Sequence, residues 1–247
     1  MTMITMMMVK VMIMKNNCVE TNKKLYKQGI IAALSCNFLW GFLPIYWQSL
    51  IPIDSLVIIF FRTFLMALTC FIIGVYQFGI KNIYKPMFET KKLTLKYILA
   101  GIVITINWSL YIWAVNSGFV IQTCMGYYLE PLIVCLFGAI FYKEKANKFK
   151  KISIGFACIG LAVMVIGYGQ FPFIAILLGL SFATYAAIKK SVYISPIQSL
   201  LFEMTFLAPI SVALIIFYEM NGKGPLDVAE PYQIGLLLFA GIFTTIP

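Results

Sequence analysis

The amino-acid sequence predicts an all-α membrane protein that crosses the bilayer several times. Of its 247 residues, 62% are hydrophobic and 11% are charged, whereas soluble domains have ~45–50% apolar and ~25% charged residues. The apolar residues gather in runs near the ~20 residues that one helix needs to span a bilayer. The basic residues fall mostly between alternate runs. Together these observations exclude a water-soluble domain.

The apolar runs give the expected elements in order. Residues 1–25 form a methionine-rich leader, in which Lys10 interrupts the apolar core that a signal peptide requires. Its opening, Met1–Thr5, resembles the start of a β-galactosidase fragment carried by cloning vectors, so the leader is either vector-derived or native, and we exclude it from the fold. We expect helices at residues 29–50, 55–78, 97–115, 119–142, 152–169, 172–188, 197–218 and 233–247, the last too short to span.

Positive charge is divided unequally between the two sides of the predicted helices. Seventeen of the 19 basic residues lie in the N-terminal segment and in every second connection. The exceptions are Arg62, inside a helix, and Lys223, in a connection on the other side. Short loops rich in lysine and arginine remain in the cytoplasm. We therefore expect a multi-pass protein of the bacterial inner membrane with a cytoplasmic N-terminus.

The remaining composition narrows the function. The loop lysines account for the net charge of +10, so this charge indicates a lipid bilayer as partner and no nucleic acid. The chain has no histidine, and its six cysteines show no paired spacing. We therefore expect no metal site, no cofactor and no enzyme.

The sequence repeats itself at an interval of 140 to 143 residues. Parts of the first three predicted helices match parts of the last three in the same order. The matched pairs are 31–34 with 174–177, 62–65 with 204–207, and 99–106 with 239–246. This interval contains five helices, and an odd number makes the second copy cross the membrane in the opposite sense. Such inverted repeats are typical of secondary transporters.

The repeat divides the chain into residues 26–170, with five helices, and residues 171–247, which end inside a third helix. A complete second copy would extend to about residue 311. We therefore expect an inverted repeat of five-helix units, with ten helices in a complete protein and about seven and a half in this chain. The chain is accordingly expected to be truncated at its C-terminus.

Three charged residues lie inside predicted helices, where each costs at least ~2.5–3.5 kcal/mol and should face a partner or a wet cavity. Arg62 and Glu130 differ in depth by roughly 6 Å, so an ion pair between them is feasible. The pair would either lock two helices or handle substrate and protons, with Glu130 as the candidate for proton coupling. Glu203 lies nearer the cytoplasmic end, where its carboxylate is expected to reach water.

Two prolines interrupt predicted helices. Pro44 and Pro131 free the carbonyls of Trp40 and Tyr127, and free carbonyls at membrane depth are tolerated where they line an enclosed cavity. Each proline is expected either to break its helix beside a cavity or to kink it for packing.

Aromatic and amide side chains share one face of the third helix. Asn107, Trp108 and Tyr111 have the spacing of neighbours on that face, which would suit the wall of a site for a flat aromatic ligand. Trp113 lies near the outer boundary and is expected in an interfacial aromatic belt.

Three motifs resemble one known family. The strings WGFLPIYW at 40–47 and NWSLYIWAVNSG at 107–118, with Gly126-Tyr127-Tyr128 and Pro131-Leu132, closely resemble the RarD proteins. These belong to the EamA branch of the drug/metabolite transporter superfamily. The resemblance runs from residue 28 to the end of the chain.

The resemblance implies a ten-helix inner-membrane permease of two five-helix repeats, associated with chloramphenicol sensitivity or resistance. The arginine of the family's second helix falls on Arg62, and the glutamate that closes its fourth helix falls on Glu144. The family usually has asparagine before the proline of the fourth helix, where this chain has Glu130. A proton-handling role for Glu130 therefore does not follow from the resemblance.

The leading hypothesis is a secondary transporter that moves a small organic solute, such as chloramphenicol or a metabolite of similar size, by alternating access. Protons are the candidate coupling ion. The alternative is a non-transporting interaction or sensor subunit, or an inactive remnant. An intramembrane lipid or prenyl transferase is disfavoured, because the chain lacks both histidine and a D-x-x-D motif. The expected substrate-site residues are Trp40, Arg62, Asn107, Trp108, Tyr111, Tyr127 and Glu130.

Overall fold

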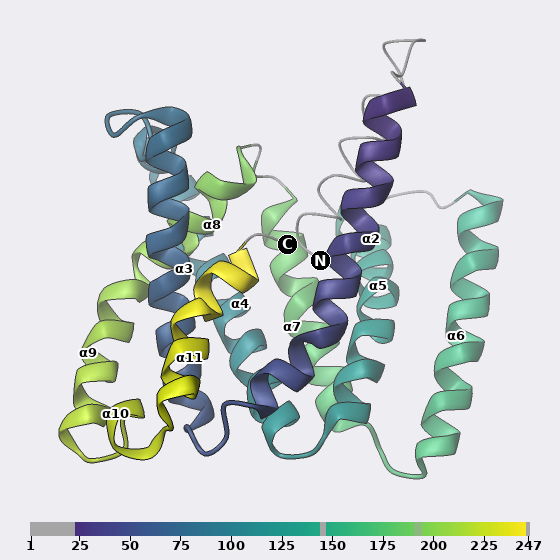
Figure 1. Ribbon diagram of the computed structural model, residues 1–247. Helices are drawn as coiled ribbons and strands as arrows, with labels where there is room; N and C mark the ends of the chain where they lie inside the picture. Colours follow the sequence, from purple (N-terminus) through teal and green to yellow (C-terminus); the bar gives the residue numbers. More distant parts are fainter. Residues whose placement is uncertain (1–22, 144–146, 191, 193, 246–247) are drawn as a thin grey trace.

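The structure is a computed structural model that describes residues 23–143, 147–190, 192 and 194–245. Most of the expected leader, residues 1–22, and Glu144 lie outside the described residues. Within them the chain folds into ten α-helices and one short 3-10 helix, with no strand (Figure 1). The predicted all-α fold class is thereby confirmed.

Five long helices come first in the chain, and each is long and apolar enough to cross a membrane. They are α2 (Lys23–Gln48), α3 (Ser55–Phe78), α4 (Lys91–Asn116), α5 (Val120–Tyr142) and α6 (Lys148–Tyr168), with the 3-10 helix Lys85–Phe88 between α3 and α4. Side-chain oxygens of Asp54, Thr90 and Asn147 accept hydrogen bonds from first-turn N–H groups of α3, α4 and α6. These caps explain where the three helices begin.

The second part of the chain is built from shorter helices. They are α7 (Phe173–Lys189), α8 (Pro196–Thr205), α9 (Leu207–Met220), the one-turn α10 (Pro225–Val228) and α11 (Pro231–Thr245). The single helix expected at 197–218 is in fact α8 and α9, which bend by 50° at their junction. Pro209 explains the bend, because it has no N–H for the carbonyl of Thr205 and its ring clashes with that carbonyl.

Of the two alternatives expected for Pro44 and Pro131, a helix break and a packing kink, the helix assignment shows no break. The helix α2 continues through Pro44 to Gln48, and α5 continues through Pro131 to Tyr142. Each proline removes one backbone hydrogen bond, but the turns on either side keep their helical geometry. A proline in the interior of a long span is therefore accommodated, whereas Pro209, three residues into α9, separates two helices.

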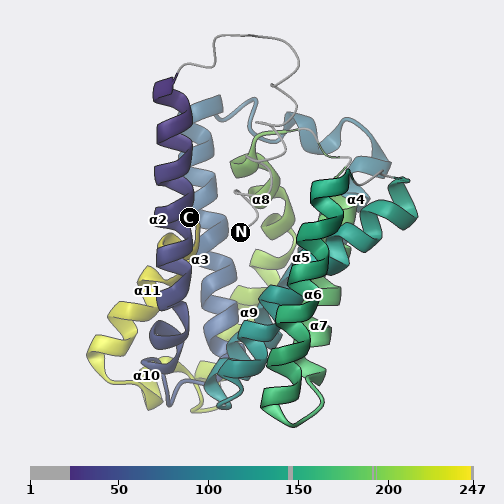
Figure 2. The ribbon, with the colours of Figure 1, turned by 90° about the vertical axis from the view of Figure 1, so that its right-hand side faces the viewer.

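Two groups of helices share α4 as a neighbour. In one group, α3 packs against α8, α9 and α11; in the other, α5 packs against α7 and α6. The helix α4 contacts α3 and α8 of the first group and α7 of the second. Figure 1 shows the first group on the left and the second on the right, and Figure 2 brings α6 to the front of the second group.

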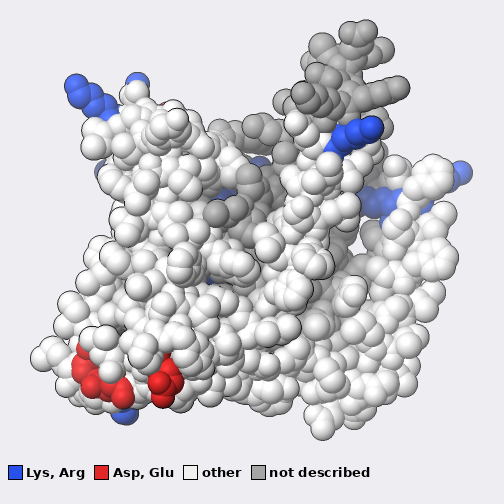
Figure 3. Space-filling model, viewed as in Figure 1, with Lys and Arg blue, Asp and Glu red and all other residues white. Residues whose placement is uncertain are grey.

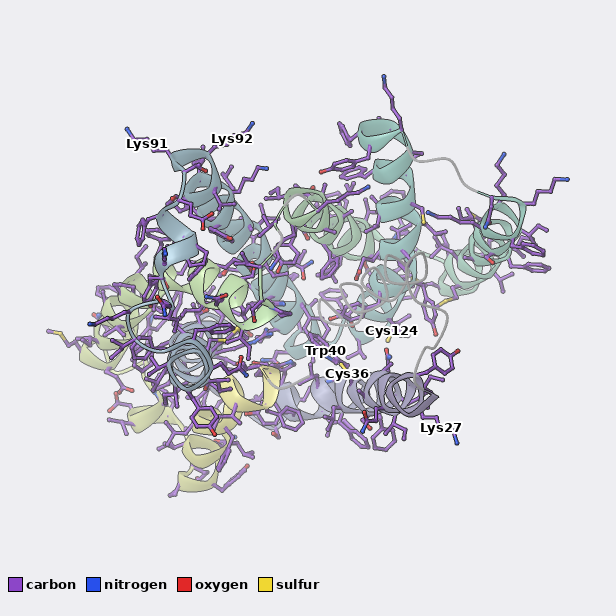
Figure 4. The ribbon with its side chains drawn as sticks, turned by 90° about the horizontal axis from the view of Figure 1, so that it is seen from above. Lys27, Cys36, Trp40, Lys91, Lys92 and Cys124 are labelled. Carbon is purple, nitrogen blue, oxygen red and sulfur yellow. The ribbon has the colours of Figure 1, made fainter. Side chains whose placement is uncertain are left out.

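Most exposed basic and acidic side chains that Figure 3 shows lie at opposite ends of the bundle, with one basic side chain at the acidic end. Basic side chains gather at the upper end in Figure 3, and acidic ones at the lower end over α9 and α10. The acidic patch belongs to the segment that contains Glu219, Asp227 and Glu230. Seen from above in Figure 4, Lys27, Lys91 and Lys92 point outward from the bundle.

Two glycines bring helices into backbone contact. A Cβ added to Gly101 of α4 would overlap the backbone of Glu203 in α8, and one added to Gly241 of α11 would overlap the backbone at Leu65 and Met66 in α3. Gly101 and Gly241 occupy equivalent positions of the predicted repeat, 140 residues apart. The two contacts are therefore reciprocal. Close approach at small residues is a principal source of helix association in membranes.

Replacing the glycine at the α3–α11 crossing is expected to destabilise the protein. In Gly241→Ala the added methyl group overlaps the α3 backbone, at an expected cost of about 1–3 kcal/mol. The matched control is Gly160→Ala in α6, where nothing lies within 4 Å of an added Cβ; it should be neutral, or stabilising by up to about 1 kcal/mol through helix propensity. Thermal unfolding in detergent measures both, and equal midpoints would contradict the tight crossing.

Candidate functional site

Arg62 is a buried cation in the first half of α3. Its side chain is held by three other helices, and only 2% of the residue is exposed. Its guanidinium lies 4.1 Å from the ring centroid of Trp108 in α4 and 5.5 Å from that of Trp47 in α2. Its Nε donates a hydrogen bond of 3.3 Å to Oγ1 of Thr244 in α11. Each cation–π contact is worth ~0.5–2 kcal/mol, so the aromatic rings hold the charge in place.

Three tyrosines extend this aromatic surface. The phenol groups of Tyr46, Tyr111 and Tyr127 lie within electrostatic range of the guanidinium. The rings of Tyr111 and Tyr127 meet edge to face with centroids 5.5 Å apart. Tyr46 donates its hydroxyl to the carbonyl of Leu236 at 2.5 Å, which ties α2 to α11. We refer to Arg62, Trp47, Trp108, Tyr46, Tyr111 and Tyr127 as the Arg62 cluster.

The ion pair expected between Arg62 and Glu130 does not form. Among the described residues, the ion pair within 4.0 Å joins Lys189 to Glu203, and no carboxylate reaches Arg62. The reason is the helix arrangement, since α3 and α5 belong to the two different groups that flank α4. Glu130 is nevertheless only 4% exposed, and its carboxylate lies near Tyr127, one turn earlier in α5.

The α4 residues predicted to share one face, Asn107, Trp108 and Tyr111, contact two different neighbours. Asn107 donates to the carbonyl of Leu178 at 3.0 Å and to Oγ of Ser181 at 2.8 Å, both in α7. Its two amide protons are therefore used in packing, whereas Trp108 and Tyr111 belong to the Arg62 cluster. Trp113, expected at the interface, is 47% exposed.

Trp40 lies half-buried in α2 and presents its indole to the protein. Its Nε1 is buried and finds no hydrogen-bond acceptor among the described residues. Figure 4 shows Trp40 and Cys36 on the side of α2 that is turned toward the bundle, opposite Cys124 of α5. The same face of α2 carries Trp47, seven residues or about two turns further on.

Sequence reasoning missed three residues that contact or approach Arg62: Trp47, Tyr46 and Thr244. The spacing of Trp47 from Trp40 was a usable signal, because residues seven apart share a helix face. Thr244 had no such signal, since it lies 182 residues from Arg62 along the chain. A surface groove between α3 and α4, which includes Asp54, contains no residue of the Arg62 cluster.

A second buried charged cluster joins α7 to α8. Nζ of Lys189 lies 2.5 Å from Oε1 of Glu203 and donates to Oγ of Ser199 at 2.6 Å. The hydroxyl of Tyr185 donates to the other carboxylate oxygen of Glu203 at 3.0 Å. Glu203 is 0% exposed, so the expectation that it reaches water is wrong. Lys189, assigned from sequence to a cytoplasmic connection, is buried as its counterion.

The Arg62 cluster lies entirely within the segment that one known protein family shares with this chain. The EamA-like transporter family matches residues 27–166, which include most of α2, all of α3 to α5, and most of α6. The chain belongs to the EamA-like transporter family. It is therefore a multi-pass membrane protein of a permease family, and its resemblance to the RarD proteins is confirmed by individual EamA relatives.

Those relatives extend the similarity beyond the EamA match. The chain is 33% identical over 228 residues to the uncharacterized transporter YojE of Bacillus subtilis, covering 90% of this chain and 74% of YojE. It is 28% identical to the RarD proteins of Escherichia coli and Streptomyces exfoliatus, covering 90% of this chain and 74% and 70% of theirs. No solved structure matches the chain significantly. The EamA match includes every member of the Arg62 cluster, whereas Thr244 lies outside it.

Removing one partner of the α7–α8 ion pair is expected to destabilise the protein strongly. Glu203→Gln leaves the charge of Lys189 buried without a counterion, at an expected cost of about 3–5 kcal/mol. The double variant Lys189→Met, Glu203→Leu removes both charges and should recover much of that loss. Thermal unfolding of the single and double variants in detergent checks this. A double variant no more stable than Glu203→Gln would show that the charge is not the cause.

Proposed function

We propose that this EamA protein is an inner-membrane permease that moves a small organic solute, such as chloramphenicol or a metabolite of similar size, by alternating access. The observation that carries the proposal is the position of the Arg62 cluster. The buried guanidinium of Arg62, in α3, is surrounded by aromatic side chains from α2, α4 and α5. Its Nε donates a hydrogen bond to Thr244 of α11. These helices come from both predicted repeats, and inverted-repeat transporters bind substrate near the midplane between their repeats.

The arrangement of the helices supports a site that changes shape during transport. The two groups of helices meet at α4, and the Arg62 cluster draws side chains from both, with Tyr127 on α5 and Arg62 on α3. A rocking of one group relative to the other would change the separation of these side chains. Such relative motion is how repeat-built transporters expose one site to either side of the membrane.

The charge distribution supports an orientation. We place the basic end of the bundle, where α2 begins, in the cytoplasm, and the acidic end over α9 and α10 on the outside (Figure 3). The surface potential of the cytoplasmic leaflet is negative and attracts exposed lysines. The rule that basic loops stay inside leads to the same orientation from sequence.

Substitution of a tryptophan in the Arg62 cluster is expected to abolish most transport. Trp108→Ala removes the ring that lies 4.1 Å from the guanidinium. It should reduce the transporter-dependent change in solute accumulation by at least about tenfold, because it removes both aromatic contact with the solute and support for Arg62. The matched control, Trp113→Ala, changes the same residue type at an exposed position of the same helix. Accumulation of labelled chloramphenicol in cells, at equal membrane expression, measures both. Equal activity of the two variants would contradict the proposed site.

We further propose that Glu130 couples transport to protons. An ionisable group buried at membrane depth is a usual carrier of protons in transporters, and Glu130 lies beside Tyr127 of the Arg62 cluster.

Glu130→Gln keeps the shape of the side chain but cannot exchange a proton. It should make solute accumulation insensitive to collapse of the proton gradient, whereas the unaltered protein responds. Accumulation measured at several pH values, with and without an uncoupler, tests this. Unchanged gradient dependence in Glu130→Gln would remove Glu130 from the mechanism.

A further inference from the structure

Several hydrogen-bond donors in the Arg62 cluster, and one next to it, lack acceptors. Among the described residues, Arg62 makes one hydrogen bond, through Nε to Thr244. Its terminal NH2 groups have no acceptor there, but they are not among the fully enclosed unpaired atoms. The indole N–H of Trp47, which is 0% exposed, has none either. The same holds for Trp40 on the same face of α2. An unmade buried hydrogen bond costs ~1–3 kcal/mol, and more when the group is charged. Because the unpaired N–H groups of Arg62, Trp47 and Trp40 occur in one region of the protein, they indicate that an acceptor is missing there.

No carboxylate of the described chain supplies that acceptor. The carboxylate of Glu203 is occupied by Lys189, Ser199 and Tyr185. Glu130 lies outside ion-pair distance of Arg62, and Asp54 caps the start of α3. The Arg62 cluster is therefore rich in donors and poor in acids, in contrast to the fully paired Lys189–Glu203 cluster.

The chemistry of the donors selects the kind of acceptor. The two terminal NH2 groups of a guanidinium match the two oxygens of a carboxylate in one plane. A single buried cation balances one negative charge, whereas a dianionic phosphate would retain an unpaired charge in an apolar site at a high cost. The adjoining rings of Trp108, Tyr111 and Tyr127 suit a flat or apolar body attached to that group.

We infer that the solute is an organic monoanion whose carboxylate binds the terminal NH2 groups of Arg62 and the indole N–H of Trp47, with an aromatic or apolar body against Trp108, Tyr111 and Tyr127. This inference rests on the proposed transport function and narrows its substrate class. The site prefers an acid over a neutral compound of the same shape, so a carboxylic acid binds more tightly than chloramphenicol, which has no carboxylate.

A matched pair of probes tests the preference without requiring transport. The purified full chain in detergent is titrated with 3-phenylpropionate and with 3-phenylpropionamide, which differ only in the charged group, and binding is measured by equilibrium dialysis. The acid should bind at least about tenfold more tightly than the amide, as expected for hydrogen bonds to a charged donor. It should also raise the unfolding temperature more, because it binds only the folded protein.

Three variants assign the preference to named groups. Arg62→Gln should reduce the ratio of acid to amide affinity to within about threefold. Trp47→Phe keeps an aromatic ring but removes the N–H. It should therefore reduce the affinity for the acid by about threefold to tenfold and leave the affinity for the amide unchanged. Trp113→Phe, at an exposed position, should change neither affinity. If Arg62→Gln does not fold, Trp47→Phe still decides.

The outcomes separate this inference from the proposed function. Four results would overturn the carboxylate site, even if neutral solutes are transported. The first three are equal affinities for acid and amide, no binding of either, and tighter binding of phenyl phosphate than of the acid. The fourth is an acid preference that survives in folded Arg62→Gln and Trp47→Phe. Selective binding of the acid that depends on Arg62 or Trp47, without its uptake into liposomes, would support the carboxylate site and count against transport.

Discussion

The close crossings at Gly101 and Gly241 determine how α8 lies against α4 and how α11 lies against α3. At the Gly241 crossing α11 contacts α3 at Leu65 and Met66. Thr244 lies one turn after Gly241, and Arg62 lies one turn before Met66, so the crossing brings Thr244 to Arg62. The Gly101 crossing likewise places α4 against α8 at Glu203. Lipid tails are as apolar as the helix surfaces, so burial of apolar side chains does not drive helices together in a membrane. Tight packing at small residues therefore provides much of the association energy. These two contacts thus bring Thr244 to Arg62 and set Glu203 against α4.

The two charged clusters use opposite solutions to the cost of a buried charge. Around Glu203, each carboxylate oxygen has a donor, and the lysine opposite neutralises the charge. Around Arg62, aromatic faces stabilise the cation, but they satisfy none of its N–H groups. Cation–π contacts compensate part of a desolvated charge without using its hydrogen-bonding edge. The hydrogen bonds of the first cluster are thus complete within the protein, whereas the second keeps N–H groups without acceptors among the described residues.

The sequence predicts the local features of this protein well and the contacts between helices poorly. The approximate positions of the long spans follow from hydropathy. Helix spacing and family motifs single out Arg62, Trp108, Tyr111 and Tyr127, which the structure brings close together. The pairing of Arg62 with Glu130 failed because depth along the membrane normal does not tell which helices are neighbours, and α4 stands between them. Asn107 shares a helix face with Trp108, but its amide turns to α7.

The errors on the second half of the chain have equally physical causes. Lys189 resembles a loop lysine in the sequence, and only the fold of α8 against α7 shows that its counterion is buried beside it. The bend at Phe206 follows from Pro209, whereas Pro44 and Pro131 lie inside apolar helices without ending them. The effect of a proline therefore depends on the packing around it, which sequence alone does not describe.

The exposure of α6 has a consequence for how this part of the chain tolerates change. No residue of α6 is buried, and the helix packs chiefly on α5. Its sequence is therefore constrained by hydropathy and length, and hardly by the shape of individual side chains. Across related chains α6 is free to diverge by exchanging one apolar residue for another, whereas α4, enclosed by both groups of helices, is constrained position by position.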